Sequence, residues 1–543
     1  MKLLNLTLSL ALTLGLLTGC APAFSGSATS TETIIQQTGS TETTTITFTD
    51  TAVTASNAAG LEIDGTALTI DKAGTYLLTG QCSDGSVKVA KGTTGVTLVL
   101  DGLNLTSKTT APIVCGKSSQ VIIEAAESTE NTLQDSENNA EDSVNADAEN
   151  AVIKCKDGSQ VTLTGSGTLN ILANGKNGIK SGATTQAEGE ASLTVQNLVL
   201  NIEAPNNDAI NAEATLSIES GTLTLSAGDD ALHSDYTLNI GSESTPGPTV
   251  TVTTSNEGLE GATVNICSGT LHITSTDDCI NAANGDLTDY AYAINISGGT
   301  VIAYSSTGDG FDSNGDLTIS GGTVAVWTAN GADNEPLDAD GSVTISGGTV
   351  LAAGGSSGMG MNLNAQQSCL IFGGNTSAPM GGQMPEFPDS SAPSEAPDRP
   401  DNQQDPNGTA SSGTSEAPTP PDQNGQMPTG EKPQGMGGPG NAATLLTENS
   451  TFSILDAQGN TLYTGTAPCN TAYLLFSAPD LTDGTTATLS SGDTETTATA
   501  QSGTLSTGRG GMGNPGGNRQ FPKNGGDKAP GQKAEGQTTQ TSK

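Results

Sequence analysis

Basic residues are scarce in this 543-residue chain, which has 18 Lys and Arg against 58 Asp and Glu and a formal net charge of −40. It contains two histidines, and no arginine precedes Arg399. Proteins that bind nucleic acid neutralise phosphates with Lys and Arg, so this charge balance argues against a nucleic-acid partner. Such acidity suits solubility outside a cell and also suits divalent cations.

Aromatic residues and helical patterns are scarce as well. Aromatics make up 3% of the chain and hydrophobic residues 33%, whereas glycine counts 70. Long helical patterns are absent after residue 20, and the composition is poor material for one large globular core. A solenoid needs only a thin core, because each coil buries its inner face against its neighbours. The composition therefore indicates an all-β chain with disordered pieces.

The N-terminus carries a short apolar run from Leu3 to Leu17, preceded by Lys2 and followed by Thr18-Gly19-Cys20. A basic start and an apolar run of this length predict a secretory signal and not a spanning helix. The Leu-x-Gly-Cys ending resembles the lipobox of bacterial lipoproteins, whose cysteine is lipidated, although a signal peptide with a chance cysteine is the alternative. We therefore expect Cys20 to be lipidated and the protein to be extracytoplasmic and tethered to the cell membrane without spanning it.

A repeated unit organises the middle of the chain. The sequence Ile-Ser-Gly-Gly-Thr-Val occurs at 296–301, 319–324 and 345–350, and an acidic loop follows the first two copies. A strand, a turn, a second strand and a loop that restart in this way are typical of a solenoid. One apolar position in each coil is expected to point inward, at Ile113, Ile153, Ile179, Ile210, Leu232, Leu259, Ile280, Phe311 and Leu337. The pattern predicts an all-β parallel β-helix of about ten coils, right-handed as parallel crossovers are.

Composition divides the chain into seven predicted segments. They are a lipoprotein signal peptide (1–20), a flexible stalk (21–43), an N-terminal β cap with the first coil (44–110), the parallel β-helix (111–373), a disordered Pro/Gly-rich linker (374–441), a C-terminal β segment that caps the helix (442–505) and a disordered tail (506–543). Within the helix, residues 127–150 are acidic and Asn-rich, and we expect them to leave one coil as a lateral loop.

Several short stretches resemble one known family. They are Ala73-Gly74-Thr75-Tyr76, the run 96–102, Thr-Glu-Asn-Thr-Leu at 129–133, Gly-Ser-Gly-Thr-Leu at 165–169, Asn177-Gly178-Ile179 and the Ser-Gly-Gly-Thr-Val copies. In this order they look like the bacterial surface β-helix proteins called carbohydrate-binding domain-containing proteins. The resemblance covers about residues 44–373 and, more weakly, 445–505. It implies a pectate-lyase-like fold, bound calcium and a polysaccharide ligand of the acidic or plant cell-wall kind, without established catalysis.

Six carboxylates recur two residues before the inward apolar residue of successive coils. We call these the carboxylate ladder: Asp208, Asp230, Glu257, Asp278, Asp309 and Glu335. Further acids stand one position earlier or three positions later, at Asp229, Asp277, Asp312 and Asp338. Stacked coils place equivalent residues about 4.8 Å apart, where like charges repel by about 3 kcal/mol per pair at an effective dielectric near 20.

Such repulsion is relieved either by raised pKa values or by cations among the carboxylates. Oxygen ligands at this density suit Ca²⁺, whereas zinc would require Cys or His. The alternative is that these side chains only hold turns and extend into solvent. The ten acidic residues named above are the predicted calcium ligands.

No catalytic motif accompanies the ladder. The pairs Asp229/Asp230 and Asp277/Asp278 could serve as acid and base in a glycosidase. However, His233 and His272 occupy different positions in their coils, and the coil lysines (Lys154, Lys156, Lys176, Lys180) lie in early coils away from the ladder. The sequence therefore assigns no catalytic residue and favours binding over catalysis. A polysaccharide lyase or hydrolase and an adhesin or structural surface protein are the alternatives.

Three aromatic residues, Tyr292, Tyr304 and Trp327, are candidates for stacking against a sugar. They lie in or beside strands, so core packing is the alternative. Cys115 and Cys155 fall on equivalent positions of neighbouring coils, either as a disulfide or as stacked buried thiols. Together these features predict a monomeric surface lipoprotein that binds polysaccharide through a calcium-loaded β-helix.

Overall fold

The computed structural model describes residues 43–506, apart from 142, 144, 185–190, 244–245, 286, 288–289, 330–333, 356–361 and 374–443. The predicted signal peptide with Cys20, the stalk up to residue 42, the linker and the tail beyond residue 506 lie outside the described residues. The described part is all-β and contains no α-helix, only a 3₁₀ turn, η1 (Glu137–Asn139). None of the described residues forms a helix that could cross a membrane.

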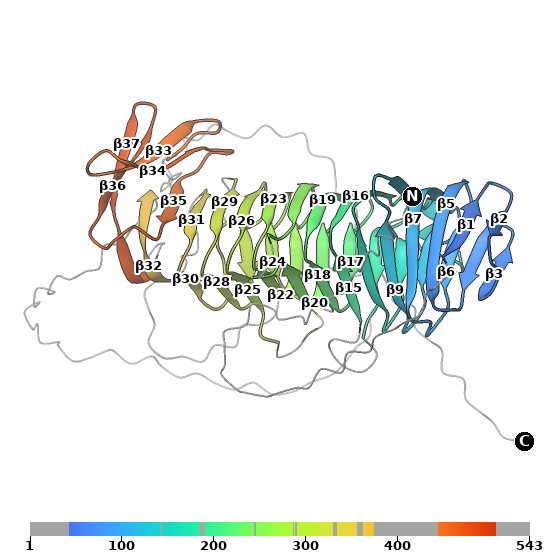
Figure 1. The fold of residues 1–543 in the computed structure, drawn as a ribbon. Helices are drawn as coiled ribbons and strands as arrows, with labels where there is room; N and C mark the ends of the chain where they lie inside the picture. The colour runs from blue at the N-terminus through green and yellow to red at the C-terminus, as the bar shows by residue number, and fades with distance from the viewer. Residues whose placement is uncertain are drawn as a thin grey trace, which may run out of the picture.

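The strands stack side by side along one long axis, from β1–β3 at one end to β31 and β32 at the other (Figure 1). Most pair in parallel with the equivalent strand one coil further on, and this produces three rows of strands. The first row carries the carboxylate ladder just ahead of its strands. It consists of β4 (Ala67–Ile70), β6 (Ser86–Val89), β8 (Ile113–Cys115), β11 (Ala151–Cys155), β14 (Asn177–Ser181), β17 (Ile210–Ala212), β20 (Leu232–Ile240), β22 (Leu259–Ile266), β24 (Ile280–Ala282) and β27 (Phe311–Ser313).

The second row follows the first along the chain, and β20 and β22 bend to contribute to both. Its other members are β1 (Thr44–Phe48), β5 (Gly74–Cys82), β7 (Val96–Thr106), β9 (Gln120–Ala125), β12 (Gln160–Gly165), β15 (Ser192–Val195), β18 (Thr215–Ile218), β25 (Ala293–Ile296), β28 (Asp316–Ile319), β30 (Val343–Ile345) and β32 (Asn362–Gly373).

The third row completes each coil. The ends of β5 and β7 begin it, and β10 (Glu130–Gln134), β13 (Thr168–Leu172), β16 (Leu198–Ala204), β19 (Gly221–Ala227), β21 (Thr249–Thr254), β23 (Thr270–Ser275), β26 (Thr300–Ser305), β29 (Thr323–Thr328) and β31 (Thr349–Gly354) continue it. Three rows of parallel strands in long sheets are consistent with the predicted β-helix, whereas its right hand stays a prediction.

One continuous core runs along the axis. The nine residues predicted to point inward, from Ile113 to Leu337, are all fully buried. Their alternation with polar neighbours matches the period of strands that bury one face. The inward position is therefore confirmed, and it sets the register for everything on the outer face.

The Ile-Ser-Gly-Gly-Thr-Val copies form the turns between the second and third rows. In each copy the second glycine has a positive φ, 81° at Gly322, which side chains disfavour. The first glycine stacks on the coil below: a Cβ at Gly321 would lie 2.2 Å from the carbonyl oxygen of Ser297. Both glycines are needed for the coils to stack at strand spacing.

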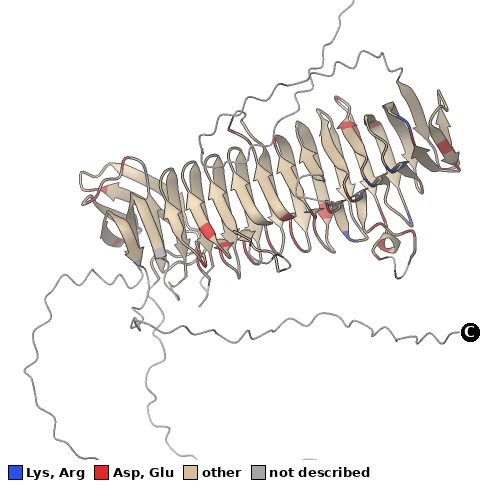
Figure 2. Ribbon diagram, turned by 90° about the horizontal axis from the view of Figure 1, so that it is seen from below, with Lys and Arg blue, Asp and Glu red and all other residues tan. Residues whose placement is uncertain are grey.

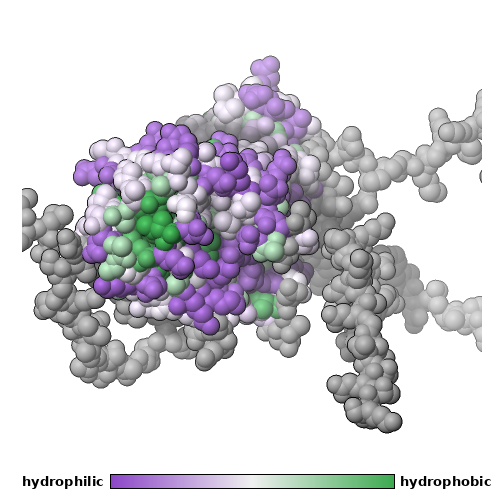
Figure 3. All heavy atoms as spheres, turned by 90° about the vertical axis from the view of Figure 1, so that its right-hand side faces the viewer, coloured by the Kyte–Doolittle hydropathy of each residue, from purple (hydrophilic) through white to green (hydrophobic). Residues whose placement is uncertain are grey.

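Antiparallel strands lie at both ends of the stack. At the first end, β2 (Val53–Ala55) pairs with β1 and β3 (Leu61–Asp64) pairs with β4, and hydrophobic side chains gather there within a hydrophilic rim (Figure 3). At the other end, β35 (Tyr473–Ser477) and β38 (Gln501–Ser506) pair with β31 and β32. A separate antiparallel sheet stands beside them, in the order β34 (Thr461–Thr466), β33 (Thr451–Asp456), β36 (Thr486–Ser491) and β37 (Thr494–Thr499).

The lateral loop is shorter than predicted. Residues 130–134 form β10, which pairs in parallel with β7 and β13 and belongs to the third row. Its Asn131 is buried, and the side-chain oxygen of Asn131 accepts a hydrogen bond from the backbone N–H of Leu103 at 2.9 Å. The polar composition of 127–150 therefore hid a strand, and the loop begins only after Gln134.

Candidate functional site

The six ladder carboxylates occupy equivalent positions in successive coils. The strand register aligns Ile210, Leu232, Leu259, Ile280, Phe311 and Leu337, and each ladder residue lies two positions before one of these. Backbone bonds confirm the alignment, since the N–H of Ala209 donates to the carbonyl oxygen of Asp230 at 2.9 Å and the N–H of Ala231 donates to that of Glu257 at 3.1 Å. The row of carboxylates predicted from the sequence is therefore present.

Three ladder aspartates also bond to the backbone of the next coil. Asp208 accepts a hydrogen bond from the N–H of Asp230 at 3.2 Å, Asp278 from that of Asp309 at 2.7 Å, and Asp309 from that of Glu335 at 2.5 Å. Each of these side chains extends along the axis and not straight into solvent. The ladder thus has a structural role in coil stacking, which leaves the second carboxylate oxygen of Asp278 and Asp309 for another partner.

A second row of side chains lies on the outer face, one position after the inward residues. We call it the outward row, and register places in it Lys88, Val114, Lys154, Lys180, Asn211, His233, Glu260, Asn281, Asp312 and Asp338. Only its last two members, Asp312 and Asp338, are among the calcium ligands predicted from the sequence. Counting one residue forward from each inward position would have found the others.

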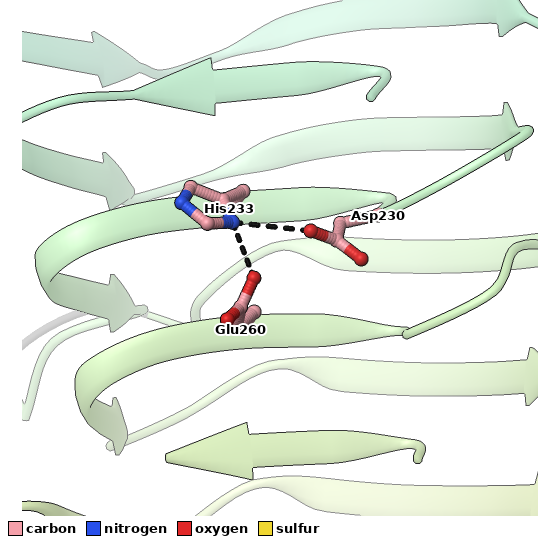
Figure 4. A group of neighbouring side chains, drawn as sticks. All are labelled: Asp230, His233 and Glu260. Carbon is pink, nitrogen blue, oxygen red and sulfur yellow. Dashed lines mark hydrogen bonds and ion pairs between the residues drawn. The ribbon is translucent and has the colours of Figure 1, made fainter. Parts of the chain in front are cut away.

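His233 sits among carboxylates on this row. Its Nδ1 lies 3.1 Å from Asp230 and also contacts Glu260 of the next coil (Figure 4). Its Nε2 lies 3.0 Å from Asp235. Burial alone lowers the pKa of His233, but the bonds to these carboxylates outweigh it and raise that pKa to about 12. The ring is therefore an imidazolium at neutral pH. It acts as a built-in counter-cation and is unsuited to act as a general base.

The ladder carboxylates around His233 respond to burial and to each other. Burial, together with Glu260 and Asp208, raises the pKa of Asp230 to about 7 against the effect of the His233 bond. Burial and the nearby charges of Glu260 and Asp230 raise the pKa of Glu257 to about 9, although Asn281 donates to Glu257 at 3.0 Å. At neutral pH, protons and one imidazolium thus offset much of the negative charge in this part of the ladder.

A second acidic group lies further along the stack. We call Asp278, Asp309, Asp312 and Asp338 the aspartate cluster, and carboxylate oxygens of the last three lie within 4.8 Å of one another. All four side chains are partly exposed. Among the described residues, no Lys or His forms a salt bridge with any of them. Acidic residues recur in the loops along one edge of the stack (Figure 2).

Three members of the aspartate cluster have raised pKa values. Burial, then the charges of neighbouring aspartates, raise the pKa of Asp278 and of Asp309 to about 7, and those of Asp312 to about 6, against backbone N–H bonds that favour the ionised forms. Raised pKa values were one of the two outcomes expected for stacked carboxylates. The other, a bound cation, would reverse these shifts because a cation favours ionised carboxylates.

Without divalent cations, we expect the protein to lose stability as pH rises from about 5 to about 9, through Asp278 and Asp309 up to about pH 7 and through Glu257 and His233 above it. The folded-state pKa values near 7 exceed the ordinary value near 3.9, so the folded state holds protons that the unfolded chain has released. The raised pKa of His233 also lowers stability as pH rises above the ordinary pKa of histidine, near 6.5, because only the unfolded chain then loses that proton. Thermal melting in EGTA should show a lower midpoint at the higher pH. A midpoint that rises with pH would contradict the assignment.

One sequence interpretation about the lysines is wrong. Lys180 does not lie away from the ladder: its Nζ donates to Asn211 at 3.0 Å, and the side-chain amide of Asn211 donates to Asp208 at 2.5 Å. The prediction failed because distance along the chain was taken for distance in space. The coil of Lys180 stacks directly on the coil that carries Asp208, the first ladder residue, and the coil of Lys154 lies one step further away.

The three aromatic candidates pack against other segments to different extents. Trp327 is 5% exposed and packs edge-to-face against Phe452 of β33, with ring centroids 5.9 Å apart. Tyr304 is the register partner of Trp327 and packs against the hydrophobic cluster that contains Trp327 and Phe452. Tyr292 donates its hydroxyl to the carbonyl oxygen of Asn284 at 2.6 Å. For Trp327 this packing is the alternative that the sequence left open, and it leaves little ring surface for a sugar, whereas Tyr292 and Tyr304 remain partly exposed.

The two stacked cysteines are thiols. Cys115 and Cys155 are register partners, both fully buried and free. They occupy an inward column of the first row. The hydrogen bond to the Cys155 thiol, and then burial, raise the pKa of Cys115 well above its ordinary value. They therefore belong to the core and not to the site.

Comparison with known proteins agrees with the geometry. A family model described as "Carbohydrate-binding domain-containing protein" matches residues 64–241 and 244–384, more than half of the chain. A protein of that description from Acetivibrio thermocellus is 33% identical over 152 residues, which are 28% of this chain and 52% of the relative, so the chain spans about half of that relative's length.

A solved structure described as a polysaccharide lyase-like protein from C. thermocellum, in a gadolinium derivative, is also similar. It is 23% identical, and the match covers 59% of this chain and 97% of that one at a TM-score of 0.29. The family model spans both the carboxylate ladder and the outward row from Lys88 to Asp338. The chain belongs to the carbohydrate-binding domain-containing protein family.

Proposed function

We propose that this chain is a lipid-anchored surface protein that binds an acidic polysaccharide with the help of Ca²⁺ held by the aspartate cluster. The observation that carries the proposal is the contrast between the two acidic groups. Asp230 and Glu260 already enclose the His233 imidazolium. Asp309, Asp312 and Asp338 converge to within 4.8 Å without a cation among the described residues.

The donor atoms of the aspartate cluster suit calcium. Carboxylates from three coils supply hard oxygen ligands, and Ca²⁺ takes six to eight of these. Asn281, in register between Glu260 and Asp312, is 9% exposed, and its side-chain oxygen has no hydrogen-bond partner among the described residues. An orphaned buried carbonyl oxygen beside converging carboxylates supports a cation site.

The coordination number of Ca²⁺ also leaves room for oxygen atoms of the glycan as ligands. Four carboxylates and one amide oxygen that each give one ligand atom do not complete a calcium shell, so hydroxyl or carboxylate oxygens of a ligand would fill the open positions. A bound cation would turn a repulsive surface into one that attracts a uronate. Support for carbohydrate as the ligand comes from the family description and from the name of the Acetivibrio thermocellus relative. Attachment through Cys20 and a right-handed coil are parts of the same proposal.

A pull-down on insoluble glycans tests the proposal. We expect the protein to sediment with a calcium gel of polygalacturonate, and with uronate polymer coupled to beads in the presence of Ca²⁺. Binding to the beads should fall by at least tenfold in EGTA, which is about 1.4 kcal/mol. Beads that carry a neutral glycan are the control for non-specific capture. Failure to bind any glycan in Ca²⁺ would favour an adhesin or structural protein instead.

A further inference from the structure

Two lysines stand side by side on the outward row, ahead of its acidic part. Lys154 of β11 and Lys180 of β14 are register partners in neighbouring coils. Figure 2 shows the basic residues gathered at this end of the stack, whereas acidic residues occur along its whole length. After the lysines the row continues with Asn211, His233 and Glu260 and ends at Asp338. A single row of side chains therefore changes from positive to negative along the axis.

The lysine pair has more positive charge than its carboxylate neighbours offset. Lys180 pairs with Glu213 at 3.1 Å, and the nearby Lys156 pairs with Glu149 at 2.6 Å. Lys154 donates to the neutral side-chain oxygen of Asn150 at 3.3 Å, and among the described residues no carboxylate lies within salt-bridge distance of it. Three ammonium groups thus share two carboxylates, in a protein with a net charge of −40.

This arrangement is costly unless an anion joins it. Burial lowers the pKa of Lys154, and the adjacent charge of Lys180 lowers it further. Like charges on directly adjacent strands destabilise a sheet. A carboxylate placed between the two ammonium groups would remove that cost and form charge-assisted hydrogen bonds, which are stronger than neutral ones.

The pair is also placed to share a ligand with the aspartate cluster. Five coil steps separate Lys180 from Asp312 along the row, about 24 Å at the usual strand spacing. Lys180 is linked through Asn211 to Asp208, so the row is continuous in polar contacts at this point. A polysaccharide chain of several sugar units that lies along the axis would meet ammonium groups first and a bound cation later.

We propose that Lys154 and Lys180 form a carboxylate-binding subsite that takes a uronate of the glycan directly, without metal. This inference rests on the proposed polysaccharide-binding function and deepens it, because it names a second, metal-independent contact on the same face. It also gives the bound chain a direction, since the two ends of the face recognise a carboxylate in different ways.

Affinity for soluble polygalacturonate, measured with the full-length protein, tests the subsite. We expect Lys154→Gln with Lys180→Gln to weaken binding by about tenfold in Ca²⁺, and to remove the residual binding that persists in EGTA. The matched control is Lys108→Gln with Lys117→Gln, which removes two exposed lysines that have their own partners, Asp84 and Asp157. This control should bind within about twofold of wild type.

Two further measurements separate the possible results. Lys154→Arg with Lys180→Arg keeps both charges and should restore most of the affinity. Methyl-esterified polygalacturonate lacks the carboxylate charge and should bind wild type and the Gln variant equally. If the Gln variant, folded by its melting curve, binds polygalacturonate as wild type does, the subsite is wrong while the proposed function stands. If wild type binds no glycan at all, the proposed function itself fails.

Discussion

Replacing His233 by glutamine should lower the free energy of unfolding by about 3–5 kcal/mol, the cost of removing one partner from a buried charge network. The imidazolium contacts Asp230, Asp235 and Glu260, and its side chain is 19% exposed. Without it, three carboxylates from two coils face one another with no cation. Their alternatives are to take up protons or to move apart, and both disturb the stacking of β20 on β22.

The measurement is the midpoint of denaturant unfolding at neutral pH in EGTA, which keeps divalent cations from replacing the lost charge. The matched control is His272→Gln, because His272 is exposed on β23, and its change should stay within about 0.5 kcal/mol. His233→Lys restores a cation and should recover part of the loss. Equal midpoints for His233→Gln and His272→Gln would show that the imidazolium contributes nothing.

The role of His233 shows where the sequence was sufficient and where it was not. The inward positions and the ladder could be predicted, because apolar spacing sets the register and parallel stacking aligns equal positions. His233 and Glu260 follow the same register, one residue after Leu232 and Leu259. They were missed because His233 was considered only as a catalytic companion of the ladder, together with His272, and not by its place in the row.

Contacts between distant segments could not be predicted in this way. Trp327 is covered by Phe452, which is 125 positions later in the chain, and such docking leaves no periodic signal in either segment. The strand β10 was hidden for a different reason: its buried Asn131 is satisfied by backbone partners in neighbouring coils, so a polar residue occupies an inward position. Composition alone could not show that those partners exist.

Calcium should raise the melting temperature of the wild-type protein, and Asp309→Asn with Asp312→Asn and Asp338→Asn should abolish that response. A ligand at 1,000 times its Kd stabilises the folded state by about 4 kcal/mol. Oxygen atoms of the three carboxylates lie within 4.8 Å of one another. Unlike the carboxylates around His233, they have no cationic side chain among the described residues, so they are the strongest candidate site for a divalent cation. Magnesium should have a smaller effect, because it demands a tighter octahedral shell and keeps its waters.

The same triple variant should melt higher than wild type in EGTA. Repulsion between like charges at this separation amounts to about 3 kcal/mol per pair at an effective dielectric near 20, before proton uptake relieves part of it. Asparagine keeps the shape and removes the charge. The substitution therefore stabilises the metal-free protein and destabilises the calcium-loaded one relative to wild type, and the two melting curves should exchange order when Ca²⁺ is added.

A variant with the same change of charge elsewhere provides the control. Glu62→Gln with Asp64→Asn and Asp71→Asn removes three exposed carboxylates near the first end of the stack and should leave the calcium response intact. Differential scanning calorimetry of these three proteins and of Asp208→Asn with Asp229→Asn, each with EGTA and with Ca²⁺, gives the eight midpoints that the comparison needs. A wild-type midpoint that is the same in both conditions would refute the metal site, because a cation bound only by the folded protein must stabilise it.

A calcium response that survives in the aspartate variant but disappears in Asp208→Asn with Asp229→Asn would instead move the site to the start of the ladder. Carboxylates of Asp208, Asp229 and Asp230 also converge there.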